Sequence, residues 1–364
     1  MSLQDSKTVV VGMSGGVDSS VAALLLKQQG YRVIGMFMKN WEELDEDGQC
    51  QSNSEYEDVV RVCDMLEIPH YSVNFVKEYW DGVFEHFLKE YKAGHTPNPD
   101  ILCNREIKFK ALYEKAKEYG ADYLATGHYV RRGVTDEGES LLLKGLDPGK
   151  DQSYFLYAIN GKVLDDVLFP VGELQKSEVR KIAAEYGLAT AQKKDSTGIC
   201  FIGKRNFKNF LGQYLKKQPG NFETLEGKVV GQHDGVAYYT IGQRRGTAIG
   251  GPGEAWFVVG KDVARNVVYV EQGADHPSLF DDCLTATESS WISPKGPPKM
   301  PFKCKAKIRY RQDDQECTIT QIEGDRLLVE FSEPQRAIAQ RQSVVFYQGD
   351  ICLGGAIIES RGLA

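Results

Sequence analysis

The stretch from Gly12 to Ser20 constrains the fold of this chain more than any other segment. It reads Gly-Met-Ser-Gly-Gly-Val-Asp-Ser-Ser and lies between an apolar, β-branched run at 8–11 and a helical pattern at 21–26. This order indicates a buried strand, a tight glycine turn and a helix. Adjacent glycines allow positive φ, and the turn's N–H groups together with the helix dipole favour an anion. We therefore predict a phosphate-binding loop; the alternative is a glycine turn capped by serine and aspartate.

The loop differs from two common phosphate-binding motifs. No lysine follows Gly15 or Gly16, as a Walker A loop requires, and the Gly-x-Gly-x-x-Gly fingerprint is absent. The run Ser14–Ser19 instead resembles the pyrophosphate-binding loop of the N-type ATP pyrophosphatases. That resemblance implies that a substrate oxygen is activated with AMP and that pyrophosphate is released. Asp18 could hold the Mg²⁺ that accompanies the phosphates.

Length and composition indicate a multidomain cytoplasmic enzyme. The chain has 364 residues, 26% of them charged and 41% hydrophobic, which favours two or three globular domains. No apolar stretch approaches the ~20 residues that span a bilayer, and residues 1–7 lack a signal pattern. The net charge of −7 is not that of a nucleic-acid binder as a whole, so only local basic patches could serve that role.

Cysteine spacing excludes the common metal motifs. None of the eight cysteines forms a Cys-x-x-Cys pair, so we expect no zinc, iron–sulfur or other metal site. Most cysteines should be reduced and buried. Cys103 is an exception because a helix start just after it would stabilise a thiolate, and Asp100 could serve as acid or base; the alternative is a packed cysteine. Cys200 follows Lys193 and Lys194, also an electropositive setting.

Hydrophobic periodicity predicts an α/β first domain. Strand patterns alternate with helical patterns, which favours a parallel sheet with helices on both faces and ligands at the carboxyl ends of the strands. From Gly220 onward short strands dominate, and a proline-rich linker at 293–301 introduces an all-β segment that suits a small barrel. The expected strands are 8–11, 31–38, 70–75 and 121–128, and the expected helices are 54–67, 76–92, 104–119, 177–187 and 206–217.

Two basic segments could meet a polyanion. Residues 303–311 alternate, so a strand would place five cations on one face and Cys304, Ala306, Ile308 and Tyr310 on the other. Such a stripe suits a phosphate backbone, although a solvated edge strand would look the same. Lysines and arginines between 204 and 217 form a second patch.

Taken together, these motifs resemble those of the bacterial tRNA-specific 2-thiouridylases. The matching segments are 12–19, 98–104, 125–129, 150–154, 195–201, 239–244 and 308–311. The resemblance implies an adenine nucleotide alpha-hydrolase-like parallel sheet, a small mixed central domain and a C-terminal β-barrel. We expect a catalytic domain at 1–205 carrying both cysteines, a central tRNA-binding domain at 206–277 and the barrel at 278–364.

The resemblance also implies a role for individual residues. ATP would be bound by Gly12, Met13, Ser14, Gly15, Gly16, Val17, Asp18, Ser19, Met38 and Gly127. The catalytic residues would be Asp100, Cys103 and Cys200. The target base would meet Asn98, Pro99 and Asp100, and other parts of the tRNA would meet His128, Lys150, Asp151, Gln152, Arg309, Tyr310 and Gln342. Without the family, His128 could equally be a structural histidine at a strand end.

The implied reaction is 2-thiolation of the wobble uridine of tRNA. ATP adenylates O2, and the terminal sulfur of a Cys200 persulfide, received from a sulfur-relay protein, replaces the AMP. Cys103 attacks either Cys200, freeing hydrosulfide, or the persulfide during transfer, and both routes end in a Cys103–Cys200 disulfide. We expect a monomer with no membrane association. The alternatives are an ammonia-fed synthetase of the same superfamily and an RNA-binding protein with a vestigial nucleotide pocket.

Overall fold

A five-stranded parallel sheet organises the first half of the chain in the computed structural model, which describes residues 7–42, 51–195 and 207–362. The strand order is β3-β2-β1-β4-β7. Because this order changes direction between β1 and β4, the carboxyl ends of these two strands flank the crevice where open α/β sheets bind ligands. The strands are β1 (Thr8–Met13), β2 (Arg32–Lys39), β3 (His70–Asn74), β4 (Tyr123–Ala125) and β7 (Val167–Leu168).

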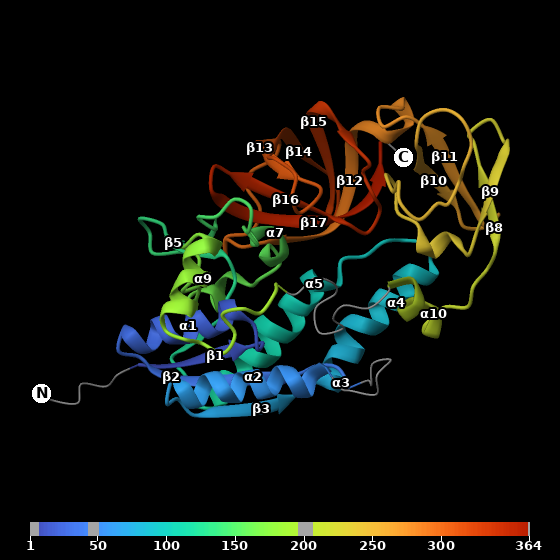
Figure 1. The fold of residues 1–364 in the computed structure, drawn as a ribbon. Helices are drawn as coiled ribbons and strands as arrows, with labels where there is room; N and C mark the ends of the chain where they lie inside the picture. The colour runs from blue at the N-terminus through green and yellow to red at the C-terminus, as the bar shows by residue number, and fades with distance from the viewer. Residues whose placement is uncertain (1–6, 43–50, 196–206, 363–364) are drawn as a thin grey trace, which may run out of the picture.

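Helices cover both faces of this sheet, as predicted (Figure 1). Along β1, Val9 and Val11 pack into one core and Val10 into the other, as the period-two alternation of a strand requires. The first face carries α1 (Val17–Gln28), α2 (Gln51–Met65) and α9 (Lys176–Glu185). The second carries α3 (Val76–Tyr79), η1 (Trp80–Phe84), α4 (Glu85–Lys92), α5 (Pro99–Leu102), η2 (Cys103–Ala111) and α6 (Leu112–Glu118).

The helix expected from about 104 begins earlier, because α5, η2 and α6 run on without a break from Pro99. Asn98 caps this helix with its side-chain oxygen, which accepts a hydrogen bond from the Asp100 N–H at 3.1 Å. Proline is well suited to the first helical position, where no N–H is needed. The prediction that Cys103 stands at the helix N-terminus is therefore wrong: it lies one turn inside, and Asp100 occupies the first turn.

A small mixed sheet follows. Its order is β10-β11-β8-β9, and only the β11–β8 pair is parallel. The helix before this sheet, α10 (Phe207–Tyr214), packs Phe210 and Leu211 into the same core as Trp41 of the first half. The strands are β8 (Gly220–Glu223), β9 (Val229–His233), β10 (Trp256–Asp262) and β11 (Val267–Gln272), with the turns η3 (Val236–Tyr238) and η4 (Pro277–Leu279).

The C-terminal part is a six-stranded barrel, closed by pairing of β12 with β17. A hairpin of β5 (Val130–Val134) and β6 (Ser140–Lys144) from the first half extends its sheet beside β17. The barrel therefore sits directly over the parallel-sheet part, with the small mixed sheet beside it (Figure 1). Its strands are β12 (Phe280–Trp291), β13 (Phe302–Lys307), β14 (Gln315–Glu323), β15 (Arg326–Arg336), β16 (Ser343–Gln348) and β17 (Ile351–Arg361).

The two remaining short helices are α7 (Ser153–Leu156) and α8 (Gly161–Leu164). Within the described ranges, no helix has the length and apolar character needed to cross a membrane.

Candidate nucleotide and RNA site

The loop between β1 and α1 has the geometry of an anion cradle. Gly15 has φ +70°, and a Cβ there would lie 2.6 Å from the Glu55 carbonyl oxygen, so only glycine fits. Gly16 caps α1 without any side-chain hydrogen bond, which leaves the first N–H groups of the helix available. The Ser19 hydroxyl organises the turn by donating to the Gly16 carbonyl at 3.1 Å and accepting from the Ser14 N–H at 3.2 Å. These residues fit a phosphate group.

Two predicted nucleotide contacts flank this loop. Gly127, just after β4, is packed so closely that a Cβ would lie 2.7 Å from both Asp18 C and Ser19 N. Met38, near the carboxyl end of β2, is 5% exposed. Since β2 and β4 are the two neighbours of β1, these residues lie on opposite sides of the loop. The sheet topology therefore brings the predicted nucleotide contacts to one edge.

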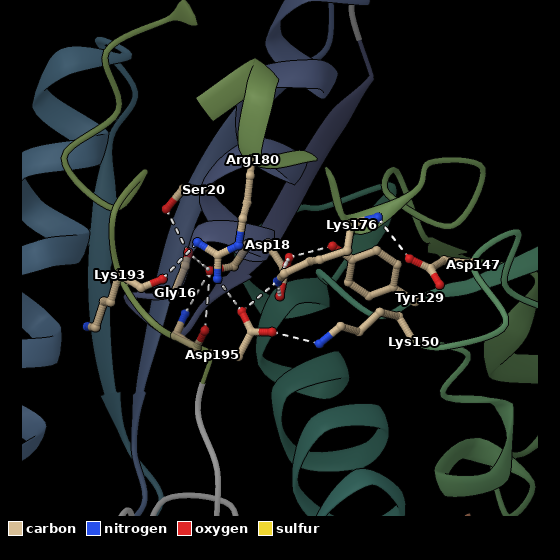
Figure 2. Close-up of polar contacts among 12 residues, drawn as sticks. Gly16, Asp18, Ser20, Tyr129, Asp147, Lys150, Lys176, Arg180, Lys193 and Asp195 are labelled. Carbon is tan, nitrogen blue, oxygen red and sulfur yellow. Dashed lines mark hydrogen bonds and ion pairs between the residues drawn. The ribbon is translucent and has the colours of Figure 1, made fainter. Parts of the chain in front are cut away.

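A network of cations and carboxylates lies against the loop (Figure 2). The Lys176 Nζ donates to both carboxylate oxygens of Asp18, at 2.7 and 2.8 Å, and the Tyr129 hydroxyl donates to Asp18 at 2.6 Å. Asp195 accepts from three cations: Lys150 at 2.7 Å, Arg180 at 2.6 Å and Lys176 at 3.0 Å. Lys176 therefore bridges the two carboxylates.

Asp195 is a permanent anion in this network. Burial alone would raise the pKa of Asp195, but hydrogen bonds from Lys150 and Lys176 outweigh it and hold the pKa well below its usual range. Lys176 and Arg180 share one face of α9, four residues apart. This helix begins at Lys176, with Gln175 and Glu178 forming a capping box, so it starts one residue before the helix predicted at 177–187, for which Ser177 is the cap that the sequence suggests.

The predicted acid/base and thiol lie one helical turn apart. Because the α5–η2–α6 helix runs back from the carboxyl edge of the sheet to the start of β4, its first residues, Asp100 and Cys103, lie at the same edge as the loop. The Cys103 side chain is fully buried. The neighbouring Asn104 donates its amide to the Phe155 carbonyl at 3.0 Å. Cys200 lies outside the residues that the structure describes.

The segment 150–152 makes internal contacts on this side of the molecule. Lys150 pairs with Asp195, as described above. Asp151 is 7% exposed and accepts hydrogen bonds from Gly145, from the Ser153 N–H and from the Ser153 hydroxyl. Gln152 accepts a hydrogen bond from the Tyr129 N–H at 2.9 Å. These contacts fix the chain beside the nucleotide loop.

His128 is buried beside the Cys103 helix. Burial, and then the nearby Lys108 charge, lower the pKa of His128 well below 6.5, so its ring is neutral at physiological pH. Its Nε2 lies 3.3 Å from the Lys108 Nζ, so it accepts, and its Nδ1 is 2.7 Å from the Thr126 hydroxyl. At 8% exposed, the imidazole has the contacts of a structural histidine.

The barrel brings its predicted RNA contacts to the same side. Tyr310 packs against Phe155 in a tilted arrangement, with ring centroids 4.4 Å apart, and Gln342 donates to the Thr96 carbonyl just before α5. Arg309 donates to the carbonyls of Ile241 and Ala337. A cavity of about 380 Å³ beside it is lined by Gly242, Arg309, Arg311, Gln312, Arg336 and Ala337.

The predicted five-cation stripe at 303–311 is wrong in part. The alternation holds through β13, where Cys304 and Ala306 are buried, but the strand ends at Lys307. Lys305 is paired with Glu316 at 3.2 Å, and Lys307 lies 3.6 Å from Asp314. Since the chain turns after Lys307, the arginines at 309 and 311 join the cavity and do not continue a strand face.

Sequence reasoning missed Lys176, Arg180 and the ionic role of Asp195. Arg180 lies on the helix predicted at 177–187 and Lys176 lies just before it, but nothing in the local sequence shows that this helix packs on α1. It also missed Asn40, which follows β2, is 1% exposed and has no hydrogen-bond partner for its amide among the described residues. A buried, unpaired amide beside the Met38 strand can serve a ligand.

Comparisons with known proteins cover almost the whole chain. Three family models match: "tRNA methyl transferase HUP domain" at residues 7–204, "tRNA methyl transferase PRC-barrel domain" at 208–272 and "Aminomethyltransferase beta-barrel domain" at 281–358. A tRNA-specific 2-thiouridylase MnmA from Protochlamydia amoebophila is 60% identical over 360 residues, 99% of this chain and 95% of that protein. Those from Bacillus licheniformis and Geobacillus thermodenitrificans are 60% and 59% identical, each over 96% of this chain and 94% of the relative.

Proposed function

The chain belongs to the family of tRNA-specific 2-thiouridylases, and we propose that it converts the wobble uridine of tRNA to 2-thiouridine at the expense of ATP. The observation that carries the proposal is the placement of the phosphate loop, Asp100 and Cys103 at one edge of the parallel sheet. The descriptions of two family models name a tRNA methyl transferase, and that of the third names an aminomethyltransferase. Relatives at about 60% identity over nearly the full chain are named for thiolation, and we give these the greater weight.

The loop and its neighbours bind and orient ATP. The N–H groups at the start of α1 would hold phosphate oxygens, and Asp18 would hold the Mg²⁺ that screens them once Lys176 turns from this carboxylate to the phosphates. Met38 and Gly127 would line the nucleotide pocket. In the adenylation step the uridine O2 attacks the α-phosphorus of ATP, the bond between this phosphorus and the oxygen bridging to the β-phosphate breaks, and pyrophosphate leaves. Asn98, Pro99 and Asp100 would place the base, with Asp100 as acid or base.

Sulfur then replaces the activated oxygen. In one route the terminal sulfur of a persulfide on Cys200 attacks C2 and AMP leaves, and the Cys103 thiolate then attacks the Cys200 sulfur and breaks its bond to the transferred sulfur. In the other, Cys103 first attacks the Cys200 sulfur and frees hydrosulfide from the persulfide, and the hydrosulfide attacks C2 and displaces AMP. In either case the sulfane sulfur is reduced to the sulfide level while the two thiols are oxidised to a disulfide, so the electrons balance. An external reductant must restore the thiols, and a sulfur-relay protein must reload Cys200.

The tRNA would be held by all three parts of the chain. The arginine-lined cavity suits a backbone phosphate, and Tyr310 and Gln342 lie close to the Cys103 helix. We propose that the boundaries near 205 and 277 separate a catalytic, a central and a barrel domain, and that the enzyme acts as a cytoplasmic monomer.

A thiolation assay tests the proposal directly. Purified protein is incubated with ATP, a persulfide donor and unmodified tRNA, and the anticodon nucleosides are examined for a sulfur-for-oxygen mass gain. Cys103→Ser and Cys200→Ser should abolish the gain yet still release pyrophosphate with tRNA. Cys283→Ser, a cysteine of the barrel strand β12, is the matched control and should retain full activity.

Three outcomes would contradict parts of the proposal. Thiolation by Cys200→Ser would overturn the persulfide assignment. Release of pyrophosphate driven by ammonia without tRNA would favour the amidating synthetase. Binding of ATP without formation of 2-thiouridine or release of pyrophosphate would favour an RNA-binding protein with a vestigial nucleotide pocket.

A further inference from the structure

The strongest unassigned feature is the cation cluster around Asp195. One carboxylate accepts from three cations, all within 3.0 Å, although a single ion pair would satisfy its charge. The three cations come from α9 and from the segment before α7, and they meet beside Gly16 and Asp18 of the phosphate loop (Figure 2). Three cations here face two carboxylates, Asp195 and Asp18, and this net positive charge next to a phosphate cradle has the composition of a polyphosphate site.

We propose that Lys176 and Arg180, with Lys150, bind the β- and γ-phosphates of ATP, and that Asp195 is a built-in competitor which occupies these cations until the triphosphate displaces it. The proposal rests on the proposed function, since it concerns the same nucleotide. It assigns a binding role to three cations and an opposing role to one carboxylate.

The contacts of Lys176 explain how the exchange would work. Its side chain is 11% exposed and its ammonium already touches both Asp18 and Asp195, so a small rotation transfers it to a phosphate oxygen between them. Its backbone is held at the start of α9, where its N–H donates to Asp147 at 2.9 Å. The cation is therefore placed by the helix and does not depend on Asp195 for its position.

Arg180 is placed independently of Asp195 as well. Its Nη1 donates to the carbonyls of Ala191 and Lys193, at 3.3 and 3.1 Å, while Nη2 meets Asp195. One side of the guanidinium is thus anchored to backbone, and the other side is free to exchange a carboxylate for a phosphate. Removing Asp195 should leave both cations in place and unmasked.

The proposal differs from a merely structural network in that replacing Asp195 and replacing its cations should change MgATP affinity in opposite directions. Equilibrium binding of MgATP to the full chain is measured by calorimetry in the absence of tRNA. Asp195→Asn should tighten binding about tenfold, because the phosphates no longer compete with a carboxylate. Lys176→Met and Arg180→Met should each weaken it about tenfold or more. In a Lys176→Met/Arg180→Met background, Asp195→Asn should have little further effect.

A neighbouring ion pair provides the control. Asp58 pairs at 2.6 Å with the ammonium of Lys193, which is two residues before Asp195. Arg180 contacts only the backbone carbonyl of Lys193, so Asp58→Asn should leave MgATP affinity unchanged. Thermal melts establish that each variant is folded. Unchanged or weaker binding in Asp195→Asn would overturn the competitor role. Because no tRNA or sulfur donor is present, these results stand apart from success or failure of the thiolation assay.

Discussion

At the scale of single residues, Gly127 in the predicted nucleotide site leaves no room for a side chain. A Cβ there would lie 2.7 Å from backbone atoms of Asp18 and Ser19, which cannot move without shifting the phosphate loop. Gly127→Ala should therefore lower MgATP affinity about tenfold and cost about 1–3 kcal/mol in the free energy of unfolding. Gly212→Ala is the matched control, because this helical glycine has open space around it, so affinity should not change and stability should hold or rise. Equal loss in both variants would contradict the argument.

Burial of His128 should make the free energy of unfolding fall as the pH is lowered. Its pKa in the folded chain lies well below 6.5, so as pH falls from 7 to 5.5 the unfolded state binds a proton that the folded state does not. The free energy of unfolding should therefore drop by about 1 kcal/mol more in the native protein than in His128→Asn over this range. Urea denaturation at the two pH values measures this difference. Equal pH slopes together with weakened tRNA binding in the variant would instead favour a direct tRNA contact.

At the scale of elements, the sequence predicted the strands, turns and helices whose formation depends only on neighbouring residues. The strand–glycine turn–helix at 8–28 follows from hydrophobic periodicity and from the conformational freedom of glycine, and it is confirmed. The Cys103 helix starts before the predicted range 104–119, because proline breaks a helix in its interior but is tolerated in its first turn. In the structure Pro99 occupies the first helical turn and Asn98 caps it.

Longer-range packing explains the elements that sequence did not predict. The strand pattern at 303–311 stops at Lys307, after which Arg309 is drawn to the carbonyls of Ile241 and Ala337, two segments distant in sequence. The Asp195 cluster could not be predicted for the same reason, since its cations come together only when α9 packs on α1. Hydrophobic periodicity contains no information about such distant partners, whereas the geometry of the predicted nucleotide loop depends on a few adjacent residues.

At the scale of the whole molecule, both later parts of the chain hold the segment that leads to the α5–η2–α6 helix, which carries Asp100 and Cys103. From the small mixed sheet, the Lys261 Nζ donates to the Gly94 carbonyl at 2.7 Å, and from the loop before β10 the Thr240 hydroxyl lies 3.1 Å from that of Thr96. From the barrel, Gln342 donates to the Thr96 carbonyl. The position of Asp100 and Cys103 therefore depends on the two parts that tRNA would also contact.

Gln342, which sequence resemblance marks as a tRNA contact, could either bind the RNA or position the segment before α5, and kinetics can distinguish these two roles. If it positions the segment before α5, Gln342→Ala and Thr240→Val should each lower kcat for thiolation about tenfold, with KM for tRNA and MgATP affinity little changed, because a small misplacement of catalytic groups slows chemistry without weakening binding. The phosphate loop belongs to β1 and α1, which these contacts do not touch. A rise in KM for tRNA in Gln342→Ala alone, with Thr240→Val unaffected, would show that the glutamine acts on the RNA and not on the segment.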